Sequence, residues 1–239
     1  NKTRMIVAVN LLGNPNDFNK IKTIIKNKNI FLIEDNCESI GATYNGQFLG
    51  TLGQAGAISF DQGKMLATGE GGMVLTNDAA VLKYACEYHD HGHESNPDRP
   101  RGRDTHSIYG FNYRMTEMQG AVGKVQLSKL NRMLEANKER YQTLEDAMGG
   151  KFLLRTIPEE CVPTFDTLIL FEPDEHIRKT VIHTCIHEGF GTKNLPDAME
   201  WHCTAFWDHA LSAEQVARSQ KTRKILEDAV AALSSEQFL

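Results

Sequence analysis

One lysine and one aspartate in the first third of the chain have the side chains and the setting that covalent chemistry requires. The apolar run 31–33 is followed by two acids, Glu34 and Asp35. Lys64 lies in a turn that follows the apolar run 55–60. Strands of α/β sheets place functional side chains just beyond their carboxyl ends. Desolvation lowers the pKa of a lysine, and its amine then becomes a nucleophile suited to an aldehyde. A buried aspartate nearby needs a cationic partner.

Pyridoxal 5'-phosphate would satisfy both residues, because it offers an aldehyde to the lysine and a pyridine nitrogen to the aspartate. The spacing also allows a plainer interpretation. In that interpretation Asp35 caps a helix and Lys64 is a solvated turn residue. The residue types and their spacing leave both interpretations open.

Short apolar runs bounded by turn residues must position these side chains. The runs 31–33, 55–60 and 73–75 are each predicted to be buried strands, and 5–9 is a further apolar run. After the turn 13–17, a helix is predicted with four apolar residues on one face: Phe18, Ile21, Ile24 and Ile25. This succession predicts one β-α-β unit, whose crossover implies parallel strands.

The rest of the chain alternates helices and strands. The glycine run 68–72 is not a dinucleotide fingerprint, because the third glycine and its helix are missing. It is predicted to be a tight connection. Helices are expected from Asp78 to Tyr88 and from Thr116 to about Ala147, where Thr116 and Gln119 resemble a capping box. A smaller α/β unit follows, with a strand at 165–171 and helices at 173–188 and 218–232, and no terminal strand is expected.

Composition excludes several classes of partner. The formal net charge of −5 gives no reason to expect nucleic acid or an anionic membrane surface. No apolar run approaches the roughly 20 residues of a membrane span. The five cysteines show neither a disulfide pattern nor zinc-site spacing, so a reducing cytoplasm is expected.

Two polar clusters invite other interpretations. Residues 89–94 contain three histidines and two acids, which could bind a metal or form a solvated or substrate-side loop. Their spacing matches no familiar zinc pattern, so no metal site is predicted. Arg99, Arg101 and Arg103 could meet an anionic substrate group, or they could belong to a solvated loop.

Several motifs occur in order along the first half of the chain. They are Glu34-Asp35, Ser59-Phe60-x-x-x-Lys64, Thr68-Gly69-Glu70-Gly71-Gly72, Thr76-Asn77-Asp78 and the octapeptide GFNYRMTE at 110–117. Together they resemble the sugar aminotransferases of the DegT/DnrJ/StrS type. The resemblance runs from about Thr3 to Leu134 and is looser beyond. It implies an α/β protein of the pyridoxal-phosphate-dependent type I, aspartate-aminotransferase-like fold.

The resemblance also implies a role for each site residue. Asp35 would pair with the ring nitrogen of the cofactor, and Ser59 would give its hydroxyl to the phosphate. Lys64 would hold the aldehyde as a Schiff base and later act as general base. Glu38 stands where many relatives carry glutamine or histidine near the ring. It is therefore either a departure that contacts the cofactor or an acid favoured by a helix dipole.

The resemblance assigns Asn112 to the cofactor phosphate of a neighbouring subunit, which would make the working unit a homodimer with a shared active site. The alternative for Asn112 is an ordinary turn residue. The expected organisation is a partial large cofactor-binding domain at 1–148, incomplete at its amino end, and part of a small α/β domain at 149–239.

The implied reaction is transamination of a keto- or aldehydo-sugar by an amino acid donor, expected to be glutamate. The phrases at 34–39 and 61–64 resemble the branch that forms 8-amino-3,8-dideoxy-octulosonate, an acidic sugar of lipopolysaccharide. Two alternatives stay open. One is a pyridoxal-phosphate-dependent sugar dehydratase of the same family, in which histidine replaces the lysine. The other is a non-catalytic dimeric homologue or fragment.

Overall fold

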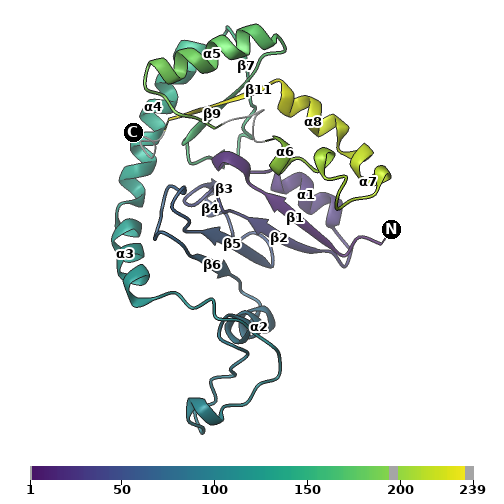
Figure 1. Cartoon of the computed structure of the whole chain (residues 1–239), viewed down its shortest axis with the longest axis vertical. Helices are drawn as coiled ribbons and strands as arrows, with labels where there is room; N and C mark the ends of the chain where they lie inside the picture. The colour runs from purple at the N-terminus through teal and green to yellow at the C-terminus, as the bar shows by residue number, and fades with distance from the viewer. Residues whose placement is uncertain (1, 194–198, 235–239) are drawn as a thin grey trace. The chain divides into compact units, whose positions relative to one another are not determined.

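The computed structural model describes residues 2–193 and 199–234 (Figure 1). Its contacts divide the chain into two compact units, which are described separately. The first comprises residues 1–133 and 158–164, and the second comprises 134–157 and 165–239. The domain boundary expected after residue 148 stays a prediction.

A four-stranded sheet forms the centre of the first unit. Its order is β1-β2-β5-β6, with bounds Met5–Val9, Phe31–Asp35, Ala55–Ser59 and Gly72–Leu75. The strands β1, β2 and β5 are parallel, and β6 runs antiparallel to β5. Helix α1, Phe18–Ile25, connects β1 to β2, which confirms the predicted β-α-β unit. Parallel pairing brings the carboxyl ends of β2 and β5 together.

The core of this unit includes α1 and a short hairpin, β3 (Thr43–Tyr44) and β4 (Gln47–Phe48). Strand β8, Cys161–Val162, pairs with β3. The buried cluster consists of Ala8, Phe18, Leu32, Ala42, Tyr44 and Leu49. Ile24, which was predicted to share the buried face of α1, is 60% exposed because it points away from this cluster.

The third predicted strand forms, but the prediction that it is buried is wrong. Met73 and Val74 of β6 are half exposed, because β6 is the last strand of the sheet. The glycine run before it serves as the predicted tight connection. A Cβ on Gly72 would lie 2.8 Å from the carbonyl oxygen of Ile58, so a side chain at this position would force β5 and β6 apart.

The buried acid Glu34 links strand β2 to the loop at residues 50–53. Its side chain is fully buried and accepts hydrogen bonds from the backbone N–H groups of Gly50, Leu52 and Gly53, at 2.6–2.7 Å. Because a buried carboxylate must be compensated, these bonds tie the loop after β4 to β2. Glu34 therefore has a structural role, next to the candidate functional residue Asp35.

Helix α2, Ala79–His89, begins as predicted with its amino end capped by the Asp78 side chain. The chain then forms a loop that projects from the sheet of this unit and contains a short 3-10 turn, η2, at Arg101–Arg103 (Figure 1). The capping box of Thr116 and Gln119 starts α3, Glu117–Ser128, as predicted. The single long helix expected here is two helices, because Lys129 caps α3 before α4, Leu130–Met148.

The second unit contains a sheet of order β10-β11-β9-β7. Its strands are Leu153–Leu154 (β7), Thr167–Phe171 (β9), Thr192–Lys193 (β10) and Ala229–Leu233 (β11). Its helices after α4 are α5 (Glu175–His187), α6 (Met199–His202), α7 (Ala213–Arg218) and α8 (Gln220–Glu227), with a 3-10 turn, η3, at Thr204–Phe206.

The helix predicted at 218–232 is wrong in its last third. Residues 229–233 form β11, a fully buried strand that pairs with β9 over five residues. Alanine favours helices in isolation, but its small side chain also fits a buried central strand, and tertiary pairing overrides the local preference. Among the described residues, no helix is both long enough and apolar enough to cross a bilayer.

Candidate active site

Two adjacent strand ends carry the first two predicted residues. Asp35 is the last residue of β2, and its register partner on β5 is Ala57. Ser59 ends β5 two residues further along. Asp35 is half-buried, and its Oδ1 accepts a hydrogen bond from the backbone N–H of Cys37 at 3.1 Å. This contact holds the carboxylate at the carboxyl edge of the parallel strands.

A compact turn fixes the backbone of Lys64 close to these ends. Asp61 accepts from the N–H of Lys64 at 3.0 Å through its carbonyl oxygen, and from the N–H of Gly63 at 2.9 Å through its side chain. Met65 and Leu66, which follow directly, are buried. The turn is therefore anchored on both sides, which explains how a lysine in a short loop keeps one position.

The side chains of Lys64 and Glu38 meet in this structure. Lys64 Nζ lies 3.3 Å from Glu38 Oε1, and the two side chains are 23% and 21% exposed. Glu38 Oε2 accepts from the backbone N–H of Leu12 at 2.9 Å, within the 3-10 turn η1, Leu11–Gly13, that follows β1. Glu38 thus connects the lysine to the end of a third strand of the sheet.

The thiol of Cys37 shows that these groups share one neighbourhood. Burial raises its pKa to about 11, and a hydrogen bond to Asp35 together with the charge of Glu38 adds to the rise, while the charge of Lys64 opposes it. One thiol therefore lies within electrostatic reach of Asp35, Glu38 and Lys64. Of these groups, Lys64 and Glu38 are in direct contact, at 3.3 Å.

We expect Cys37 to resist alkylation by iodoacetamide near neutral pH. Because only the thiolate reacts, a pKa of about 11 leaves Cys37 almost entirely protonated, and its labelling should rise only as the pH approaches that value. Peptide mass spectrometry after timed labelling would measure this, with the exposed Cys86 as the internal comparison. Labelling of Cys37 as fast as Cys86 at pH 7 would contradict the described burial.

The other two predicted site residues, Ser59 and Asn112, have different local hydrogen bonds. Ser59 Oγ accepts from the N–H of Asp61 at 3.2 Å, so its own hydrogen is free to be donated elsewhere. Asn112 is exposed on the loop after α2, where its amide oxygen accepts from Arg114 Nε at 3.0 Å. Among the described residues, no hydrogen bond joins Asn112 to the other four predicted site residues.

The polar clusters of this loop have local partners. His91 and His93 face the carboxylates of Asp90 and Asp104 at 3.1 and 3.2 Å, and Arg101 pairs with Asp90. In the part of the chain that the structure describes, no group of three histidine, cysteine or acidic side chains converges as a metal site would require. The sequence indicates Asp90 only as one of the two acids at 89–94, and it gives Arg114 no separate role, although Arg114 lies inside the octapeptide at 110–117.

A cavity of about 830 Å³ lies one strand away from Asp35. It is lined by residues of β5, β6, α2 and the segment 113–119, and Ala57, the register partner of Asp35, is among them. Neither Lys64 nor Asp35 lines it. The candidate reactive side chains therefore lie outside this cavity, at the strand ends.

The donor set suits pyridoxal phosphate. It combines a half-buried acid for a cationic ring nitrogen, an amine for an aldehyde and a hydroxyl with a free hydrogen for a phosphate oxygen. All three groups come from two neighbouring strands of one sheet, β2 and β5, and from the turn that follows β5.

Comparison with known proteins identifies the family of the chain. The DegT/DnrJ/EryC1/StrS aminotransferase family matches residues 1–235. The chain belongs to this family. The predicted resemblance is thereby confirmed over nearly the whole chain, including the part that matched only loosely by motif.

Curated proteins that are similar to this chain include enzymes of two kinds. The chain is 35% identical to GDP-perosamine synthase of Escherichia coli O157:H7 over 139 residues, which is 58% of this chain and 37% of that protein. It is 41% identical to GDP-4-keto-6-deoxy-D-mannose 3-dehydratase of Yersinia pseudotuberculosis over 150 residues, 58% of this chain and 38% of that protein. The matched region spans well under half the length of these relatives.

Solved structures of the family share the fold. An aminotransferase from Psychrobacter cryohalolentis superposes with a TM-score of 0.78 at 28% identity, covering 100% of this chain and 65% of that one. An E. coli GDP-4-keto-6-deoxy-D-mannose-3-dehydratase with bound hydrated PLP gives a TM-score of 0.77 at 25% identity, with coverage of 100% and 65%. These likenesses confirm the predicted aspartate-aminotransferase-like α/β fold.

Proposed function

We propose that the protein is a pyridoxal-phosphate-dependent sugar aminotransferase. The observation that carries this proposal is Lys64, which lies beside Glu38 in the turn after β5, the strand that pairs in parallel with the strand ending at Asp35. Family membership supports it, since the family is one of aminotransferases. The donor is an amino acid, glutamate, and the acceptor is a keto- or aldehydo-sugar.

When bound, pyridoxal phosphate supplies an aldehyde and a ring that withdraws electrons from the substrate carbon. Asp35 lies at the end of β2, where its carboxylate would hold a proton on a ring nitrogen. Lys64 Nζ would bind the aldehyde and, once released by a substrate amine, would move the proton between the reacting carbon atoms. Ser59 would donate its free hydrogen to a phosphate oxygen.

In this scheme Glu38 positions the side chain of Lys64. Its carboxylate holds the Lys64 side chain in place through the contact at 3.3 Å, and it is itself fixed by the Leu12 N–H. A glutamine at this position could accept a hydrogen bond but would not attract the ammonium charge. Glu38 therefore keeps the amine in position before the cofactor arrives.

We also propose that two copies of the chain form a homodimer with a shared active site. Asn112 is exposed and makes no hydrogen bond to the other predicted site residues of its own chain. Around it lie exposed large apolar side chains, which mark interaction surfaces. They include Tyr109 at 95% exposure, and also Phe111, Tyr113, Met115 and Met118. A second copy would cover these side chains and receive Asn112.

For the acceptor, the finer assignment is an eight-carbon acidic sugar that becomes 8-amino-3,8-dideoxy-octulosonate. Its support is the pair of phrases at 34–39 and 61–64, which contain Glu38 and Lys64. Such a sugar belongs to lipopolysaccharide synthesis, and we place the reaction in the cytoplasm, where the five free cysteines would stay reduced. A nucleotide-linked keto-sugar is the wider alternative for the acceptor.

A dehydratase is the second candidate, because a relative with that activity is 41% identical over 150 residues. The resemblance implies histidine in place of the lysine in such enzymes, and Lys64 therefore favours amine transfer. A non-catalytic dimeric scaffold is the third possibility, and it requires that no cofactor binds.

The deciding experiment incubates the full-length protein with pyridoxal phosphate, glutamate carrying heavy nitrogen, and a panel of keto- and aldehydo-sugars. Mass spectrometry of the sugars is expected to show the heavy nitrogen in one of them. A sugar that loses a hydroxyl oxygen without gaining the label would identify a dehydratase. A protein that stays colourless after gel filtration with the cofactor would identify a scaffold.

A further inference from the structure

The segment that carries Asn112 is fixed against the end of α2. Asp90, the first residue after that helix, forms an antiparallel bridge with Asn112. The N–H of Phe111 donates to the carbonyl oxygen of Tyr88 at 2.8 Å, and the N–H of Tyr113 donates to that of His89 at 2.9 Å. Asn112 is therefore part of a short ladder, not a free loop residue.

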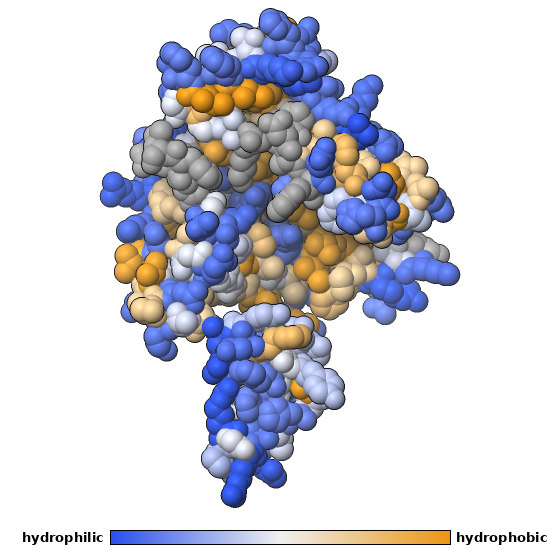
Figure 2. Space-filling view, viewed as in Figure 1, coloured by the Kyte–Doolittle hydropathy of each residue, from blue (hydrophilic) through white to orange (hydrophobic). Residues whose placement is uncertain are grey.

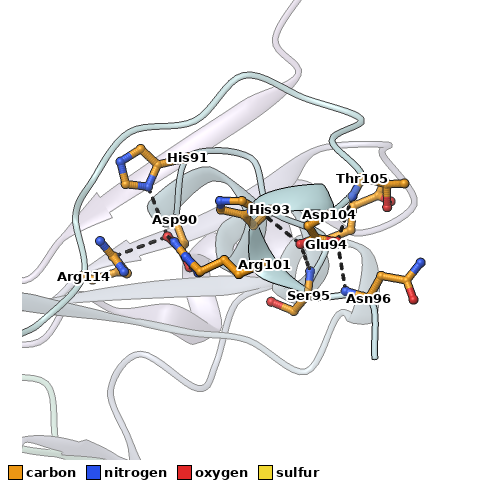
Figure 3. A network of polar contacts seen from close by, with 10 residues as sticks. All are labelled: Asp90, His91, His93, Glu94, Ser95, Asn96, Arg101, Asp104, Thr105 and Arg114. Atoms are coloured by element: carbon orange, nitrogen blue, oxygen red, sulfur yellow. Dashed lines mark hydrogen bonds and ion pairs between the residues drawn. The ribbon is translucent and has the colours of Figure 1, made fainter. Parts of the chain in front are cut away.

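The carboxylate of Asp90 forms ion pairs with two arginines, Arg101 and Arg114 (Figure 3). Arg101 donates to both of its oxygens, at 2.8 and 2.6 Å, and Arg114 Nε lies 3.3 Å from Oδ1. The Asp90 side chain is only 14% exposed, whereas both arginines are about half exposed. The hydrogen bond from Arg101 lowers the pKa of Asp90 despite the opposing effect of burial, and the hydrogen bond with His91 and the charge of Arg114 add to this lowering, so the carboxylate is ionised at neutral pH.

Arg114 decides which way the amide of Asn112 faces. A guanidinium can only donate hydrogen bonds, so the Asn112 atom that meets Arg114 Nε at 3.0 Å must be the carbonyl oxygen. The NH2 group of the same amide then faces the opposite direction. Asn112 is exposed, and in the described part of the chain no acceptor takes its two N–H donors.

We propose that Asp90 is a positioning residue that acts through Arg114 to present the NH2 group of Asn112 to the cofactor phosphate in the partner subunit. This inference rests on the proposed function. Asp90 forms an ion pair with the guanidinium of Arg114, and this guanidinium donates a hydrogen bond to the amide oxygen of Asn112. The NH2 group of Asn112 can then donate to an anion. Arg101 secures Asp90 from the other side without touching Asn112.

The test compares pyridoxal phosphate with pyridoxal, which lacks the phosphate. Affinity for each is measured by absorbance titration of the cofactor-free, full-length protein. Asp90→Asn removes the charge that holds Arg114, and Arg114→Met removes the donor to Asn112 but leaves the pair of Asp90 with Arg101. Asp98→Asn is the matched control, because Asp98 is an exposed acid of the same loop that makes no side-chain ion pair among the described residues.

Asp90→Asn and Arg114→Met are each expected to weaken pyridoxal phosphate about tenfold, the loss of one charge-assisted hydrogen bond, and to leave pyridoxal unchanged. Adding either change to Asn112→Ala should cause no further loss, because the three residues act in series. Asp98→Asn should match the natural protein. Equal weakening of both ligands, or unchanged binding of both, would overturn the inference while leaving the proposed function intact. Failure of the natural protein to bind pyridoxal phosphate would overturn both.

Discussion

Replacing Lys64 by alanine is expected to abolish amine transfer, with a loss of at least about a thousandfold, because one change removes both the nucleophile and the general base. The same variant should lose the visible absorbance band that forms when pyridoxal phosphate binds covalently to a lysine. Turnover of labelled glutamate and the spectrum of the reconstituted protein would measure the two effects.

The variant Lys64→Arg distinguishes loss of the reactive amine from loss of the positive charge. Arginine keeps a cation beside Glu38, so the local ion pair at 3.3 Å can persist, but a guanidinium cannot bond to the aldehyde. This variant should therefore fold like the natural protein and still be inactive. Lys124→Ala, at an exposed position of α3, serves as the matched control and should keep full activity. Persistence of the band and of amine transfer in Lys64→Ala would refute the proposed role.

Mixing two inactive variants is expected to restore activity if the active site is shared between subunits. Each Lys64→Ala subunit still supplies Asn112, and each Asn112→Ala subunit still supplies Lys64. A mixed dimer then contains one complete site and one site that lacks both residues. With equal amounts and random exchange, about one quarter of all sites are complete, so activity should return to about one quarter of the natural level.

Subunit exchange requires mild denaturation and refolding of the mixture, and the separately treated variants are the baseline. Activity that does not rise above this baseline, with mixed dimers present by native mass spectrometry, would place Asn112 in its own subunit's site. Because Asn112→Ala removes only a phosphate contact, the assay is run at a cofactor concentration low enough to leave its homodimer largely empty.

The sequence alone was enough to single out the candidate site residues of this protein. Asp35 and Lys64 could be singled out because short apolar runs bounded by turns predict strand ends, and parallel strands bring those ends together. Helix starts at Asp78 and Thr116 were readable because capping depends on residues close in sequence. The strand ends and the helix starts could be predicted because both depend on residues close in sequence.

Only the tertiary structure decided the features that depend on distant residues. Residues 229–233 form a strand because they pair with β9 on one side and with β10 on the other. The local sequence does not indicate these partners. Met73 and Val74 stay exposed because β6 ends the sheet. The link from Asp90 through Arg114 to Asn112 required a loop to fold back over more than twenty residues. Hydrogen-bond partners so far apart in sequence are chosen by packing, and packing is a property of the whole fold.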